Sequence, residues 1–227
     1  MSYYPVFLKL EGMAVLVVGG GRVAQRKVET LLAYGANVSV VSRELTPELK
    51  ELTDKGQVRF LGEEMKETFF DDVSLVVAAT DDAALNHQVS QGARSRGLWV
   101  NAVDQPVDCT FIVPSIVRRG DLMIAISTSG KSPALSKKIR KSLDAQFGSE
   151  YADFLSLMGA LRQAVLAMGL PQQENSRIFH EIVDSDIIEA LAREDRESVT
   201  ASLKRILPAD MAITPILDKV FLARGAL

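Results

Sequence analysis

The sequence has very little of what builds a disulfide framework or a metal centre. Its 227 residues include a single cysteine, Cys109, and two histidines, His87 and His180. One cysteine excludes an intramolecular disulfide and a thiolate metal cage, and it fits a reducing compartment. Two histidines far apart in the sequence are too few for a histidine-rich metal centre. We therefore predict no resident metal.

A large excess of charge and long apolar runs are also absent. Lysine and arginine number 26 against 29 acidic residues, a net charge of −3, so the overall charge does not favour nucleic acid. The longest apolar runs, such as residues 13–18, fall well short of the roughly 20 residues that cross a bilayer. The N-terminus lacks the pattern of a secretory signal. We expect a cytoplasmic globular protein with no nucleic-acid or membrane partner.

The first hundred residues alternate strand and helix signals. Short apolar runs at 14–18, 38–41, 58–61, 75–79 and 98–103 are separated by helical segments. This pattern predicts a parallel sheet with helices on both faces, an α/β fold of the Rossmann type. Residues 111–117 and 122–127 then predict a β-hairpin that turns at 118–121, and a helix begins at Ser132-Pro133. Only helical segments follow. We expect domains at 1–113, 114–148 and 149–227, the last all-helical.

A glycine-rich turn follows the first predicted strand. Gly19, Gly21 and Ala24 fit the pattern G-x-G-x-x-G/A between a strand and a helix, where the backbone approaches a pyrophosphate at a helix N-terminus. The alternative is a structural turn without a ligand. The expected acidic residue after the second strand is missing: Glu44 follows late, and Arg43 favours a 2′-phosphate, so NAD is only slightly preferred over NADP. The predicted cofactor-binding residues are Gly19, Gly21, Arg22, Val23, Ala24, Ser42, Arg43, Glu44, Thr80, Asp81 and Val103.

Asp104 lies just past the fifth predicted strand, at the sheet edge where such folds bind their ligands. A carboxylate there could take a proton as hydride leaves a substrate. The alternative is a turn or capping aspartate before Gln105 and Pro106.

Residues 125–132 come close to a P-loop, but Ala125 replaces the first glycine and Pro133 removes an amide. No later strand ends in an aspartate for Mg²⁺, so a P-loop phosphotransferase is a disfavoured hypothesis. The stretch still predicts an anion-binding helix start. The predicted substrate-binding residues are Ser127, Thr128, Ser129, Gly130, Lys131 and Ser132. The cations of the following helix (Lys131, Lys137, Lys138, Arg140 and Lys141) indicate either a solvated face or a landing site for a polyanion.

Segments 5–7, 17–27, 78–82, 101–104, 111–115 and 126–134 together resemble the precorrin-2 dehydrogenase module of siroheme synthases. The resemblance implies NAD-dependent oxidation of precorrin-2, a polycarboxylate tetrapyrrole, to sirohydrochlorin. In some members insertion of Fe²⁺ as a second substrate follows. It also implies a homodimer built through the central hairpin and helix. Asp104 matches the aspartate that is the family's best catalytic candidate for both steps, and the metal would meet it there.

The sequence departs from the family pattern in two places. We expect no fused methyltransferase domain, and Thr128-Ser129 stands where many relatives have Ser-Gly or Thr-Gly. Because some single-module relatives lack chelatase activity, metal insertion stays open. The alternative function is a non-catalytic Rossmann module that senses NAD(H) and regulates a partner.

Overall fold

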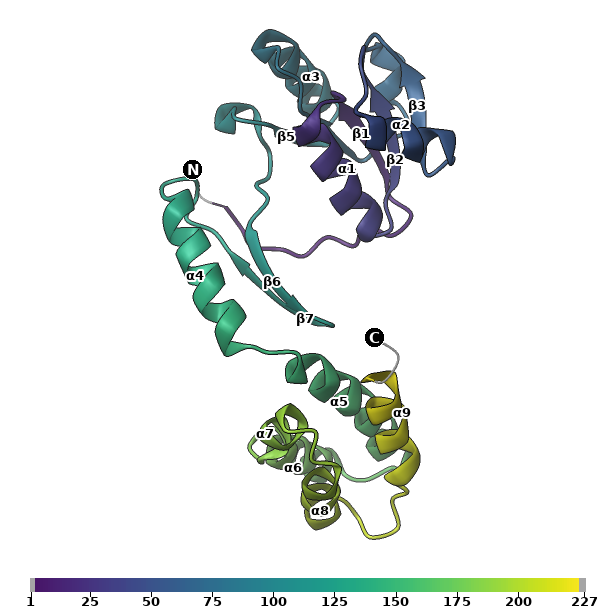
Figure 1. Ribbon diagram of the computed structural model, residues 1–227, viewed down its shortest axis with the longest axis vertical. Coiled ribbons are helices and arrows are strands. Elements are labelled where there is room, and N and C mark those ends of the chain that lie inside the picture. The colour runs from purple at the N-terminus through teal and green to yellow at the C-terminus, as the bar shows by residue number, and fades with distance from the viewer. Residues whose placement is uncertain (1–2, 225–227) are drawn as a thin grey trace. The chain divides into compact units, whose positions relative to one another are not determined.

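The computed structural model describes residues 3–224, and the chain divides into two units between Val113 and Pro114. Strands β1 (Ala14–Val18), β2 (Asn37–Val41), β3 (Val58–Gly62), β4 (Leu75–Ala78) and β5 (Trp99–Ala102) form the first unit's parallel sheet. Its helices are α1 (Arg22–Ala33), α2 (Pro47–Asp54) and α3 (Ala83–Ser95), with short 3₁₀ helices η1 (Glu67–Phe70) and η2 (Pro106–Asp108). The strand order β3-β2-β1-β4-β5 confirms the predicted Rossmann-type fold (Figure 1).

Alternate residues of the central strands are buried on opposite faces of the sheet. Val15 and Val17 of β1 belong to a core shared with α1 and α2, whereas Leu16 and Val18 belong to one shared with α3. None of these four side chains is more than 2% exposed. Because helices cover both faces, a strand of the sheet must be apolar at every position, which is why β1 and β4 are continuous apolar runs.

Side chains cap the starts of α2 and α3 in the first unit. The Thr46 side chain accepts a hydrogen bond from the Leu49 amide ahead of α2, and Pro47 takes the first helical position. The Asp82 carboxylate accepts bonds from the Ala84 and Leu85 amides at the start of α3. These caps fix the loops that leave β2 and β4, and those loops border the candidate site.

The second unit starts with a β-hairpin of β6 (Ser115–Arg119) and β7 (Leu122–Ile126), followed by α4 (Pro133–Gln146) (Figure 1). The prediction of a strand from residue 111 was wrong, because Pro114 has no amide proton to donate to a ladder and β6 begins only after it. The turn is also shorter than predicted. It needs only Gly120 and Asp121, since Gly120 adopts a φ of 57°.

The remaining helices of the second unit pack around a core of their own. They are α5 (Glu150–Ala167), α6 (Gln172–Val183), α7 (Ile187–Ala192), α8 (Arg196–Ile206) and α9 (Thr214–Arg224). Leu157, Ile182, Leu203 and Leu217 are at most 1% exposed in this core. No helix within residues 3–224 is both long and apolar enough to pass through a bilayer.

Candidate active site

The topology of the first unit creates a switch point at the carboxyl ends of its central strands. β1 pairs with β2 on one side and with β4 on the other, so the connections that leave β1 and β4 diverge. Ligands of open α/β sheets bind at such a switch point. The structure places the glycine loop after β1, Thr80 and Asp81 after β4, and Val103 after β5, all at this edge.

The glycine loop is held tightly against the neighbouring connections. The Gly19 amide donates to the Val41 carbonyl at 2.8 Å, and the Thr46 amide donates to the Gly20 carbonyl at 3.0 Å. A Cβ on Gly19 would lie 2.7 Å from the Ala79 carbonyl carbon, and one on Gly20 would lie 2.6 Å from the Ser42 Oγ. Only glycine fits at these two positions, because backbone or packed side chain fills the space.

Gly21 is different, because the space beside it is open. A Cβ added there would meet no atom within 4 Å. Gly21 is the N-cap of α1 and no side chain caps the helix. The first intrahelical bond runs from the Gln25 amide to the Gly21 carbonyl, so the amides of residues 22–24 precede the helical ladder. An open cradle at an uncapped helix N-terminus fits the pyrophosphate of a dinucleotide.

Residues 42–44 lie against this loop. The Ser42 Oγ donates to the Glu44 carbonyl oxygen at 2.7 Å, which curls the segment after β2 toward Gly20. The side chains of Arg43 and Glu44 are exposed. Their exposure suits either contact that the sequence predicts, a ribose hydroxyl for Glu44 or a 2′-phosphate for Arg43.

Thr80 is fixed by an asparagine that the sequence reasoning missed. The Asn86 Oδ1 accepts from the Thr80 amide at 3.1 Å, and the Asn86 Nδ2 donates to the Thr80 carbonyl at 2.9 Å. Asn86 is 3% exposed. It stands on the apolar face of α3 with Val89 and Ala93, and this misplaced polarity is the signal that could have identified it. These two bonds hold the loop after β4 in one conformation at the carboxyl edge of the sheet.

Asp104 has an exposed side chain on a constrained backbone. Its φ is 60°, the left-handed region that aspartate adopts more readily than most residues but still at a cost. The Gln105 amide donates to the Ala102 carbonyl at 3.3 Å, and the Cys109 Sγ donates to the same carbonyl at 3.2 Å. The loop therefore closes on the end of β5 and leaves the carboxylate free to face a ligand.

Two groups near this loop have altered proton affinity. Burial raises the pKa of the Cys109 thiol, so the sulfur keeps its proton, in accord with its hydrogen bond to the Ala102 carbonyl. Cys109 is half-buried. Burial also lowers the pKa of Lys27 on α1, and the charge of neighbouring Arg26 adds to the effect.

The predicted anion-binding helix start lies in the second unit, at the beginning of α4. Two backbone amides of this segment already donate to its own side chains. The Ser127 Oγ accepts from the Ser129 amide at 3.0 Å, and the Thr128 Oγ1 accepts from the Ser132 amide at 3.1 Å. The Ser132 Oγ caps the helix by accepting from the Leu135 amide. This start therefore presents fewer free amides to an anion than α1 does. Lys131 and Gly130 are exposed.

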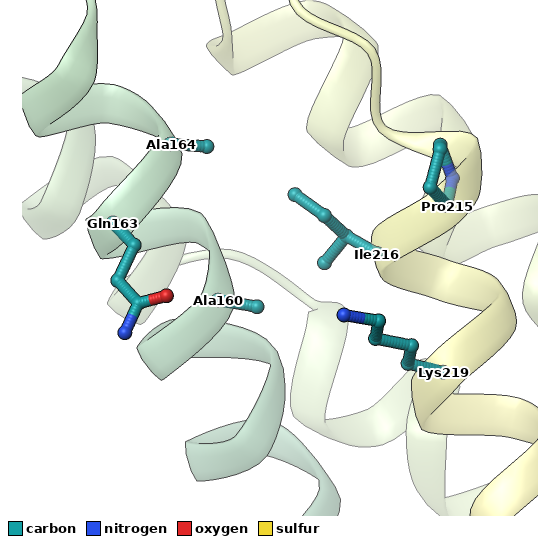
Figure 2. A pocket seen from close by; sticks show the side chains of 6 residues that line it. All are labelled: Ala160, Gln163, Ala164, Pro215, Ile216 and Lys219. Carbon is teal, nitrogen blue, oxygen red and sulfur yellow. The ribbon is translucent and has the colours of Figure 1, made fainter.

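A hollow of 360 Å³ between α5 and α9 contains none of the predicted site residues. Figure 2 shows Ala160 and Ala164 on one side, with Ile216 and Lys219 reaching toward them from α9. Its lining combines small apolar side chains with one cation and one amide, which offers no pair of groups for acid–base chemistry.

Within residues 3–224, no group of three or more histidine, cysteine, aspartate or glutamate side chains is arranged to hold a metal ion. His180 contacts its own helix, with its Nδ1 2.7 Å from the Ser176 carbonyl oxygen.

Two family models match the chain. A model described as "Putative NAD(P)-binding" covers residues 6–115, and one described as "Sirohaem biosynthesis protein central" covers residues 119–146. Siroheme synthase of Sodalis glossinidius is 37% identical over 209 residues, 92% of this chain and 44% of that protein. The enzyme of Methylobacillus flagellatus is 38% identical over 208 residues, 91% of this chain and 44% of that protein.

This chain therefore spans less than half the length of these curated relatives. One solved structure that resembles this chain is that of SirC, a precorrin-2 dehydrogenase, and the match extends over the whole of SirC. The two are 30% identical with a TM-score of 0.74, and the match covers 88% of this chain and 100% of SirC. The chain belongs to the precorrin-2 dehydrogenase module family of the siroheme synthases.

Proposed function

We propose that this protein oxidises precorrin-2 to sirohydrochlorin with NAD⁺ as the hydride acceptor. The observation that carries the proposal is the open, uncapped glycine cradle at the β1/β4 switch point, in a chain that aligns with all of a precorrin-2 dehydrogenase. A pure NAD(H) sensor would need the cradle but no catalytic carboxylate beside it.

Bound NAD⁺ supplies a carbon that accepts a hydride from the substrate. The chain supplies the rest. The N-terminus of α1 and the backbone of residues 19–24 hold the pyrophosphate, and residues 42–44 meet the adenosine ribose. Thr80, Asp81 and Val103 border the nicotinamide end. The oxidation removes a hydride and a proton, and Asp104 accepts the proton while the hydride leaves, so the electrons and the charge balance.

The substrate's carboxylates need cations, and the second unit offers them. Lys131, Lys137 and Lys138 are exposed on α4. We propose that they, with Ser127–Ser132, receive the carboxylates of precorrin-2. Since the hydroxyls of Ser127 and Thr128 already accept backbone bonds, the contribution of this segment is expected to come mainly from charge.

We also propose that the protein is a cytoplasmic homodimer whose second unit consists of a dimerising part, 114–148, and a helical part, 149–227. On α4, Leu135 is 47% exposed and Ser136 is the helix's buried residue, so part of the apolar side of α4 is uncovered within residues 3–224. Light scattering of the purified protein tests this: a dimer mass is expected for the wild type, and Leu135→Glu should shift it toward the monomer. A monomeric wild type would contradict the proposal.

The central test is anaerobic incubation with precorrin-2 and NAD⁺, with NADP⁺ in parallel. NADH formation with the spectrum of sirohydrochlorin is the expected result, and Asp104→Ala should retain NAD⁺ binding while losing turnover. Addition of Fe²⁺ then shows whether metal insertion exceeds the spontaneous rate. A folded protein that binds NAD⁺ but turns over neither cofactor would favour the sensor function instead.

A further inference from the structure

The loop that carries Asp104 is bonded to α3 at several points along one face of that helix. The helix residues involved are spaced by four, three and four positions, which places them on one stripe. Each contacts the segment 105–108. We call these contacts the α3 tether: Ala83 with Gln105, His87 and Ser90 with Asp108, and Arg94 with Val107.

The hydrogen bonds of the tether are spread along α3 and reach both ends of the segment 105–108. The Gln105 Nε2 donates to the Ala83 carbonyl at 3.0 Å, and the Ser90 Oγ donates to the Asp108 carbonyl at 2.5 Å. The His87 Nδ1 lies 2.8 Å from the Asp108 Oδ1. The whole of η2 is therefore fixed to α3, immediately after the residue that the proposed reaction uses.

Within the tether, His87 and Asp108 form a bond between two ionisable side chains. The Asp108 side chain is only 8% exposed, whereas that of His87 is 52% exposed. The Gln91 amide nitrogen lies 2.9 Å from the His87 Nε2 and can only donate. Nδ1 therefore holds the ring proton and donates it to the Asp108 carboxylate. A buried carboxylate that lost this partner would be poorly satisfied, so the pair strongly favours one loop position.

The backbone of Asp104 needs such support. A non-glycine residue at a φ of 60° relaxes unless its surroundings fix it. On one side the Cys109 Sγ and the Thr110 amide bind the loop to β5, with the Thr110 amide 2.8 Å from the Val100 carbonyl. On the other side the α3 tether fixes residues 105–108. The two attachments leave Asp104 little freedom.

We propose that His87 and Asp108 are positioning residues that hold the Asp104 carboxylate in its reactive place. This inference rests on the proposed function, because it assigns Asp104 the proton-accepting role. In this proposal the pair acts only through the loop. A shift of a reacting group by about 1 Å can lower a reaction rate on the order of 100-fold. Because the loop keeps its other attachments, loss of this one should lower kcat about tenfold.

The test compares His87→Ala, Asp108→Asn and a control, Ser95→Ala. Ser95 lies on the same helix and donates to the Gly92 carbonyl, but has no bond to the loop. Asparagine retains the Oδ1 acceptor for the His87 proton, so Asp108→Asn should keep most of the activity. Steady-state kinetics with precorrin-2 and NAD⁺, NAD⁺ titration, and hydrogen–deuterium exchange of the peptide that contains residues 103–110 are measured for each protein.

For His87→Ala we expect kcat to fall about tenfold, with KM for precorrin-2 and the NAD⁺ dissociation constant within about twofold of wild type. Exchange in residues 103–110 should become faster, while Ser95→Ala matches the wild type in every measurement. Equal kcat and equal exchange in His87→Ala and Ser95→Ala would overturn the inference. If the wild type itself forms no NADH, the proposed function fails, and unchanged exchange in His87→Ala would then show that the tether does not hold the loop either.

Discussion

Two substitutions in the glycine loop, each of which adds one methyl group, should affect different properties: one the stability of the fold and the other the binding of the cofactor. Gly19 has a φ of 123°, and a Cβ there would press on the Ala79 carbonyl group. Gly21 has a φ of −79° and a ψ of −177°, which any residue adopts, and its Cβ would enter open space. Gly19→Ala should therefore damage the fold, whereas Gly21→Ala should damage only the site.

The magnitudes follow from these two environments. For Gly19→Ala, an unfavourable backbone conformation together with overpacking against main chain should cost about 2–4 kcal/mol of unfolding free energy. In a unit of this size that corresponds to a fall in Tm of about 10 °C or more. For Gly21→Ala the change should stay within about 0.5 kcal/mol, since the lower entropy of the unfolded chain and the poorer N-cap oppose each other.

The effect of Gly21→Ala on cofactor affinity should be large. The added methyl group occupies the space through which the pyrophosphate reaches the α1 amides, and charge-assisted hydrogen bonds contribute about 1.5–3 kcal/mol each. NAD⁺ affinity should fall about 10- to 100-fold. Thermal denaturation and titration calorimetry, run on both variants and the wild type, measure the two quantities. A Gly21→Ala protein that binds NAD⁺ as tightly as the wild type would refute the placement of the pyrophosphate at this loop.

Three further changes test other parts of the structure. Asp82→Ala removes two amide hydrogen bonds of 2.9 and 3.1 Å at the start of α3 and should cost about 1 kcal/mol in urea unfolding. The Ser198 hydroxyl and amide lower the pKa of the Asp195 carboxyl, so its stabilisation is present at neutral pH and is lost as pH falls through that lowered pKa. The urea midpoints of wild type and Asp195→Asn should accordingly differ at pH 7 and begin to converge only as pH falls from about 4 through that lowered pKa; a gap that persists in stronger acid would contradict this. Burial raises the pKa of Cys109, so iodoacetamide at pH 8 should label it slowly in the native state and readily in urea, and equal rates would contradict the described environment.

Most of the first unit could be predicted because its signals are local. β1 and β4 are continuous apolar runs, and glycines or capping residues mark the ends of α1, α2 and α3. The start of β6 could not be placed from apolar character alone, because residues 111–113 are as apolar as a strand. There the segment bonds to β5 instead, through the Thr110 amide and the Phe111 carbonyl, which accepts from the Asn101 side chain.

In the candidate site, too, some features follow from local sequence signals and others depend on the fold. The glycine cradle follows from its spacing and its place between a strand and a helix, so the sequence alone points to it. The roles of Asn86, His87 and Asp108 do not follow from the sequence, because each acts through a partner 6 or 21 residues away. Contacts of that separation depend on how α3 lies on the sheet, which only the folded structure supplies.

Three non-glycine residues of the described chain have a left-handed backbone: Asp104, Ser129 and Glu194. Glu194 has a local explanation, since its amide donates to the Leu191 carbonyl at 3.0 Å and the residue links α7 to α8. Asp104 and Ser129 link no pair of helices, and both fall within the residues that the sequence predicts to meet ligand. Backbone strain persists where surrounding contacts enforce it, and it concentrates at functional sites. The strain at Asp104, between the bonds to β5 and the α3 tether, is therefore an independent reason to place the chemistry of the proposed reaction at its carboxylate.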